Sequence, residues 1–273
     1  PAQRRPQPRL DVRISLSVVP GSEIGAERLL DLERVGDRTP GFLVQRQTDS
    51  SPSFVIRGIE AAASGALSEP SVSVFIDGFD VSRLRGSGVE LLDLERLEIA
   101  RGPQGTLYGR GAQTGAVSIV THRPVLGENA ARAEVLAGED DLRGATVVLN
   151  ASPHPERFAL RASIRRREQA PTVANIAADG IPANDDDLFA GRLSARWRPA
   201  ETLLVDFVFN HQLDRDAPVV TKAIGLASPD GDRDPFSDAA QQTGRVPPRR
   251  EINRGQLIAQ WERGDWRIEA MAG

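Results

Sequence analysis

The chain has 273 residues, of which 40% are hydrophobic and 26% charged, with a net charge of −4 and no cysteine. Such a chain can bury a core. The composition excludes a disulfide scaffold, a thiol nucleophile and thiolate metal sites, and it gives no reason to expect nucleic acid as a partner. No apolar run reaches the length of about 18 residues that a membrane-spanning helix needs.

The first part of the chain predicts a flexible arm followed by a helix. Residues 1–13 are rich in Pro, Gln and Arg, which favours an unstructured N-terminal arm. Leu29, Leu32 and Val35 then recur at helical spacing, and Gly36 is a candidate stop signal.

A second helix is predicted after Ser87, because Ser87 and Glu90 have the spacing of a capping box. The hexapeptide Leu-Leu-Asp-Leu-Glu-Arg occurs at both 29–34 and 91–96, which suggests two similar amphipathic turns. Residues 72–76 and 116–120 are rich in β-branched side chains and predict strands.

From about residue 131 the pattern changes to strands that alternate apolar and polar residues. The segments with this period of two are 131–137, 142–151, 157–165, 192–198, 202–211, 255–262 and 266–270. A soluble antiparallel sheet with one wet face explains the alternation, and so does a membrane barrel that is apolar toward lipid and polar toward its lumen.

The connectors between these segments favour the barrel. After the first, they alternate in length: 152–156, 199–201 and 263–265 are short, whereas 169–190 and 214–253 are long. Outer-membrane barrels have short turns at the periplasmic end and long loops outside, and a compact soluble domain seldom carries long unstructured connectors.

The segment Leu-Glu-Ile-Ala-Arg-Gly-Pro-Gln-Gly-Thr-Leu-Tyr-Gly at 97–109 carries the most specific signal. Together with Phe-Val-Ile-Arg-Gly at 54–58 and Val-Phe-Ile-Asp-Gly at 74–78, it resembles the plug domain of TonB-dependent outer-membrane receptors. The signature positions are Ile56, Gly58, Asp77, Gly78, Glu98, Gly102, Pro103, Gln104, Gly105, Tyr108, Gly109 and Gly115.

The resemblance implies an α+β plug domain followed by antiparallel all-β transmembrane barrel strands. We expect an N-terminal arm at 1–13, the plug at 14–126 and the first seven or so barrel strands at 127–273. Family members close about 22 strands around the plug. The expectation is therefore an incomplete barrel, belonging to a fragment of a longer receptor.

The resemblance also implies a function. A receptor in the outer membrane of a Gram-negative bacterium would take up a scarce ligand, above all an iron–siderophore complex, with energy from TonB and its inner-membrane motor. Arg57 and Arg101 match plug arginines that pair with barrel glutamates in relatives, so they are expected to lock the plug. Residues 10–17 are the weak candidate for the segment that TonB captures.

Other functions have less support from the sequence. The glycines at 102–115 lack the Gly-Lys-Ser/Thr ending of a phosphate-binding loop, and the three histidines lack metal-ligand spacing. The acidic runs at 185–187 and 230–234 are expected to be solvated loops. We therefore expect no enzyme, metal or cofactor. The alternative function is a soluble periplasmic plug module that binds or regulates without transport.

Overall fold

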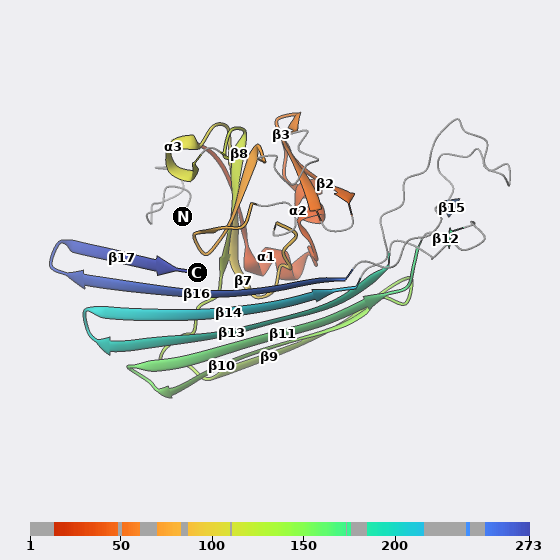
Figure 1. Cartoon of the computed structure of the whole chain (residues 1–273). Coiled ribbons are helices and arrows are strands. Elements are labelled where there is room, and N and C mark those ends of the chain that lie inside the picture. Colours follow the sequence, from red (N-terminus) through yellow and green to blue (C-terminus); the bar gives the residue numbers. More distant parts are fainter. Residues whose placement is uncertain are drawn as a thin grey trace. The chain divides into compact units, whose positions relative to one another are not determined.

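The computed structural model describes residues 14–48, 51–60, 70–82, 87–109, 111–172, 174–175, 185–215, 239–240 and 249–273. The chain splits into two compact units, Pro1–Arg123 and Pro124–Gly273 (Figure 1). The predicted arm at 1–13 and the acidic run at 230–234 lie outside the described residues. Among the helices described, none has the length and hydropathy to cross a membrane.

The first unit is built on a mixed five-stranded sheet with the order β1-β7-β8-β5-β6. Its strands are β1 (Ser15–Pro20), β5 (Val72–Ile76), β6 (Phe79–Asp80), β7 (Leu94–Arg101) and β8 (Gly115–Thr121). A smaller sheet joins β2 (Phe42–Thr48), β3 (Ser51–Ile56) and β4 (Ile59–Glu60). The helices are α1 (Gly21–Ala26), α2 (Leu32–Arg38) and α3 (Gly105–Tyr108).

The core of this unit forms around the central strands of the larger sheet. Leu97, Ile99 and Val117 are fully buried, in line with the position of β7 and β8 inside the sheet. Val35 from α2 belongs to the same buried cluster. Both predicted strands, 72–76 and 116–120, are confirmed, because apolar β-branched residues at these positions are covered on both faces.

The repeated hexapeptide folds in two different ways. In the first copy, Asp31 caps α2 by accepting a hydrogen bond from the backbone N–H of Arg34 at 2.8 Å. In the second copy, Asp93 has a positive φ of 49° and strand β7 starts at Leu94. The predicted helix after Ser87 is therefore wrong: residues 87–93 are not helical, and pairing with β1 and β8 overrides the local helical pattern.

The predicted stop at Gly36 is also wrong, because α2 continues to Arg38. Gly36 is a point of close packing inside the helix. A methyl group at this position would lie 3.1 Å from the backbone nitrogen of Val44 in β2. The absence of a side chain thus lets the helix approach the strand, and helix termination comes two residues later.

The second unit is an antiparallel sheet of seven strands in the order β17-β16-β14-β13-β11-β10-β9 (Figure 1). The strands are β9 (Ala130–Ala137), β10 (Arg143–His154), β11 (Phe158–Gln169), β13 (Asp186–Ala200), β14 (Leu203–Asp214), β16 (Arg250–Arg263) and β17 (Trp266–Ala272). All seven predicted strands are confirmed. The described sheet is open, with β9 and β17 at its edges.

Two strands start earlier than their alternation predicts: β13 at Asp186, and β16 at Arg250 within the connector expected at 214–253. Residues 186–190 were expected in a long loop, yet β13 begins at Asp186, opposite Gln169 of β11. Asp187 pairs with Arg166, and Asp186 pairs with Arg167. Cross-strand ion pairs extend the ladder here where apolar alternation has stopped. Within the long connectors, β12 (Ala174–Asn175) pairs in parallel with β15 (Ala239–Ala240).

The two faces of the seven-stranded sheet differ in chemistry. The register aligns apolar side chains across strands, as in Leu193 opposite Phe209 and Phe207 opposite Leu257. The exposed large members of this face are Val135, Val147, Leu149, Ile164, Leu193, Trp197, Phe207, Phe209, Leu257, Trp266 and Ile268. The opposite face is polar, with Ser163 opposite Arg192 and Arg192 opposite Asn210.

Candidate functional site

The signature segment forms a closed loop between β7 and β8. Two backbone hydrogen bonds join the two ends of the loop, from Gly102 N to Thr114 O at 2.8 Å and from Gln104 N to Ala112 O at 2.9 Å. Gly102 has a φ of 100°, a conformation that favours glycine directly after the strand. Pro103 follows, and α3 fills the loop from Gly105 to Tyr108.

The loop is packed onto the sheet at its base. The ring of Tyr108 lies 4.8 Å from that of Phe75 in β5, centroid to centroid. At Gly115, a methyl group would lie 2.4 Å from Cδ1 of Ile56 and 2.5 Å from the backbone oxygen of Ala100. Glycine is therefore required at 115 by close approach, and the buried Ile56 is the side chain that occupies the space.

Two hairpins of the same type present an arginine and an aspartate. Arg57-Gly58 joins β3 to β4, and Asp77-Gly78 joins β5 to β6. All four residues have positive φ, at 54°, 77°, 52° and 90° in that order. Two-residue turns with positive φ at both positions are type I′, which match the twist of paired strands. Asp-Gly after a strand predicts this turn, whereas Arg-Gly does not.

The structure brings the two predicted lock arginines to the same turn. The backbone N–H of Arg57 donates to Gly41 O at 3.0 Å, and the Arg101 guanidinium donates to the neighbouring Pro40 O. Arg101 Nε also donates to Ser15 Oγ at 3.2 Å. A methyl group on Gly102 would lie 3.6 Å from Arg57 Nη1. Within the described residues, no carboxylate forms an ion pair with either arginine.

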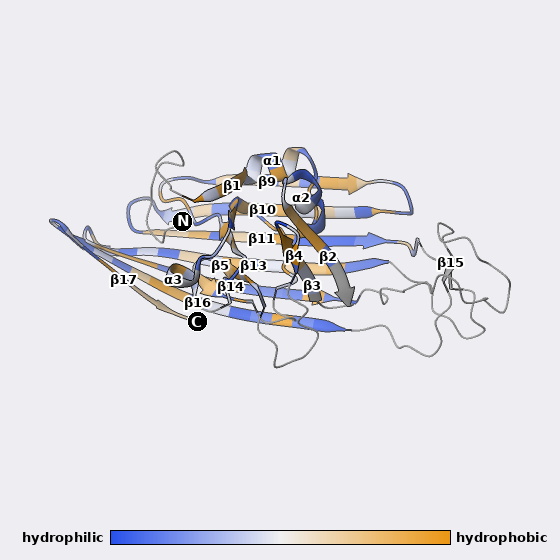
Figure 2. Cartoon of the chain, turned by 90° about the horizontal axis from the view of Figure 1, so that it is seen from above, coloured by the Kyte–Doolittle hydropathy of each residue, from blue (hydrophilic) through white to orange (hydrophobic). Residues whose placement is uncertain are grey.

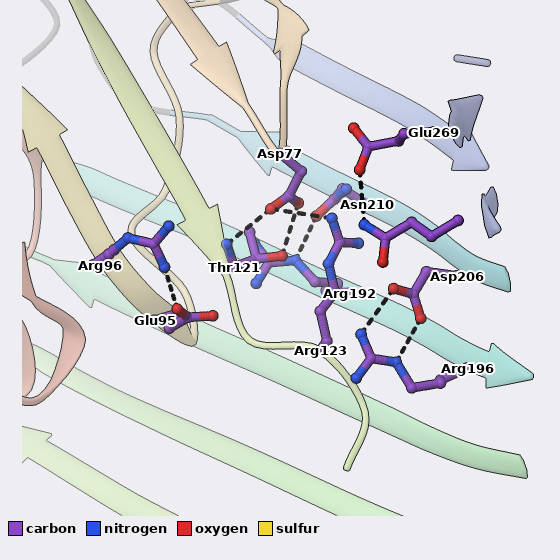
Figure 3. Close-up of polar contacts among 11 residues, drawn as sticks. Asp77, Glu95, Arg96, Thr121, Arg123, Arg192, Arg196, Asp206, Asn210 and Glu269 are labelled. Carbon is purple, nitrogen blue, oxygen red and sulfur yellow. Dashed lines mark hydrogen bonds and ion pairs between the residues drawn. The ribbon is translucent and has the colours of Figure 1, made fainter. Parts of the chain in front are cut away.

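Asp77 fastens its hairpin to the end of β8 (Figure 3). Its buried carboxylate accepts hydrogen bonds from Thr121 N at 2.9 Å and from Thr121 Oγ1 at 2.8 Å. Arg123 Nη2 lies 3.4 Å from the same carboxylate. The sequence places Asp77 in the signature, but nothing in it shows that Thr121 and Arg123 are its partners.

The other signature residues support this arrangement rather than a chemical centre. Glu98 is buried in β7 and accepts from Arg96 Nε at 2.7 Å, and Gly109 ends α3 with a φ of 80°. Gln104 is buried and its backbone oxygen accepts from Tyr108 N. Across the described parts of the chain, no group of three or more acidic or histidine side chains could hold a metal ion.

The apolar face of the second unit has different residues at the two ends of its strands. All three tryptophans of the chain, Trp197, Trp261 and Trp266, lie on this face near the short connectors. At the edge near the long connectors, Arg143 Nε and Arg166 Nε donate to Glu168 at 3.0 and 3.1 Å. Figure 2 shows these strand ends as hydrophilic and the middle of the strands as largely hydrophobic.

Comparison with known proteins shows what the first unit is similar to. Residues 8–116 match the family model described as the TonB-dependent Receptor Plug Domain. The first unit is therefore similar to a TonB-dependent receptor plug.

Sequence relatives and solved structures agree with this assignment. Pesticin receptors of Yersinia enterocolitica and Yersinia pestis are 31% identical over 113 residues, which is 41% of this chain and 16% of theirs. The ferric yersiniabactin uptake receptor of Yersinia pestis has a TM-score of 0.79 at 20% identity, over 94% of this chain and 40% of that one.

A second solved structure shows the same coverage. The alcaligin outer-membrane receptor of Bordetella pertussis has a TM-score of 0.67 at 17% identity, over 96% of this chain and 38% of that chain. The described fold is therefore a plug followed by part of a receptor barrel. The chain spans well under half the length of these relatives.

Proposed function

We propose that the chain is the plug (14–126) and the first part of the wall (127–273) of a TonB-dependent receptor in the outer membrane of a Gram-negative bacterium. The receptor takes up a scarce ligand, above all an iron–siderophore complex. Proteins of similar fold include a ferric yersiniabactin uptake receptor and a ferric-catecholate import receptor, which supports this ligand class.

The observation that carries the membrane part of the proposal is the exposed apolar face. Along β13 the apolar side chains run from Phe189 to Trp197. Eight steps of about 3.3 Å give about 26 Å of strand, or about 20 Å if the strand is tilted by about 40°. Outer-membrane barrels carry an apolar band of about 25 Å, bordered by aromatic residues at the interfaces. The tryptophans near the short connectors fit the periplasmic border.

In the proposed mechanism, ligand binding outside the cell shifts the plug and exposes the N-terminal segment to TonB, which pairs with it as an added strand. Residues 15–17 of the candidate segment lie in β1, which pairs with β7. Within the described strands β1 is an edge strand, so a partner strand could add to its other side.

The test is growth on single ferric siderophores as the only iron source, in cells that carry the full-length gene. The proposal predicts growth that depends on both this gene and TonB. Growth that needs neither would contradict it, and a protein recovered as a soluble periplasmic monomer would favour the alternative plug module.

Arg57 and Arg101 are proposed to lock the plug, a role supported by their meeting at the Pro40-Gly41 turn. In the same growth assay we expect Arg57→Gln with Arg101→Gln to lower uptake by about tenfold or more, because an ion pair to the wall would be lost. Arg34→Gln, which removes an exposed arginine of α2, is the control. Unchanged uptake in the double variant would rule out the lock.

A further inference from the structure

The chain passes from the first unit to the second between Arg123 and Pro124, and side chains fasten it on each side. Before the junction, the Asp77 carboxylate accepts two hydrogen bonds from Thr121 and lies beside Arg123. After it, residues 124–129 lead to β9 without forming a strand of their own. The backbone of this exit segment needs other hydrogen-bond partners.

Asn150 of β10 supplies three of them. Its Oδ1 accepts from Val125 N at 3.0 Å, and its Nδ2 donates to Val125 O at 3.0 Å and to Glu128 O at 2.7 Å. The carboxamide thus pairs with Val125 as a neighbouring strand would, and both amide hydrogens are used. Asn150 is only 4% exposed, so its carboxamide is shielded from water, whereas Val125 is 43% exposed.

Ser152, two residues further along the same face of β10, also bonds to the exit segment. Its Oγ accepts from Gly127 N at 2.8 Å and donates to Phe158 O at 3.1 Å. Its backbone N–H donates to Asn129 Oδ1 at 2.9 Å. The exit segment is therefore bonded to β10 at residues 125, 127, 128 and 129, and Pro124 is fully buried.

The entry to the plug is held differently. Among the strands that the structure describes, β1 lies at the edge of its sheet and pairs with β7 alone. An edge strand can separate from its one neighbour without disturbing the rest of a sheet, whereas the exit segment is held by side-chain bonds from the buried residues Asn150 and Ser152. The two ends of the plug thus differ in how firmly they are held.

We propose that Asn150 and Ser152 form an exit clamp, which makes residues 124–129 a rigid extension of the sheet, so that plug motion during transport stops at Arg123. This proposal rests on the proposed function, in which TonB pulls on the N-terminal segment and so moves the plug. Without the clamp, residues 124–129 would form a flexible linker of up to about 20 Å between the plug and the sheet. The clamp keeps the point where the plug leaves the wall fixed while the N-terminal side moves.

Amide hydrogen exchange of the full-length protein tests the clamp without ligand or TonB, so its result does not depend on transport. We expect Asn150→Ala to speed exchange at Val125 by about tenfold or more, and Ser152→Ala to do so at Gly127, because each removes the acceptor of that N–H. The Asn253→Ala control, which loses a contact to His211 in the same sheet, should change neither.

Protection of the β10–β11 ladder in each variant shows that the sheet remains folded. Unchanged exchange at both Val125 and Gly127 in folded variants would overturn the clamp. In vesicles with an energised TonB complex, the wild-type exit segment should stay protected while amides of β1 exchange faster. Loss of protection at residues 125 and 127 in that experiment would show that the motion passes the junction.

Discussion

Gly115→Ala should unfold much of the plug, lowering its free energy of unfolding by about 3 kcal/mol or more. The new methyl group would lie 2.4 Å from Ile56 Cδ1 and 2.5 Å from the backbone oxygen of Ala100. β8 cannot move aside, because β7 and β5 bond it on both sides. Hydrogen exchange of β7 and β8 amides in the full-length protein measures the loss.

Gly105→Ala is the matched control from the same signature segment. Nothing lies within 4 Å of a methyl group at this position, which is the first residue of α3. Alanine restricts the unfolded chain and favours helix, so stability should stay equal or rise by up to about 1 kcal/mol. Equal exchange in the two variants would contradict the packing derived for Gly115.

Leu257→Arg should impair membrane insertion, at a cost of about 2–4 kcal/mol if the residue lies near the bilayer midplane. Leu257 is exposed in the middle of the apolar face, opposite Phe207. An arginine there would carry its charge into lipid, where no partner is available. The fraction of protein that enters lipid vesicles, read as heat-modifiable gel mobility, measures the effect.

Gln256→Arg places the same side chain one residue away, on the polar face at the same height. Because a side chain on this face points away from lipid, insertion should change much less than in Leu257→Arg. If both variants insert equally well, the apolar face does not meet lipid. If both fail equally, the damage comes from arginine in β16 rather than from the face it occupies.

The sequence predicts the second unit better than the first for a physical reason. In an antiparallel sheet with two different faces, every second residue reports its face, so the seven strands are visible in the alternation. The start of β13 escapes this rule. There Asp186 and Asp187 join the ladder through ion pairs with Arg167 and Arg166, and charged pairs leave no apolar period.

In the plug, position in the sheet overrides local pattern. The same hexapeptide caps a helix at Asp31 and leads into a strand at Leu94, because only the second copy lies between two strands that can bond it. The αL conformation of Arg57 and the partners of Asp77 depend on contacts far along the chain. The plug motif shows the resemblance to a receptor family. It does not show that Arg57 and Arg101 both bond to the Pro40-Gly41 turn.

The most direct test of the account is quenching of the native tryptophan fluorescence by lipids brominated at different depths. Trp197, Trp261 and Trp266 all lie on the apolar face near the short connectors. The full-length receptor is used with every tryptophan outside residues 1–273 replaced by phenylalanine. If the apolar face meets lipid, bromines near the headgroups should quench strongly and bromines at the bilayer centre less. Aqueous iodide should quench little. Free access of iodide with no quenching by any lipid would show that this face meets water, and would contradict a receptor wall.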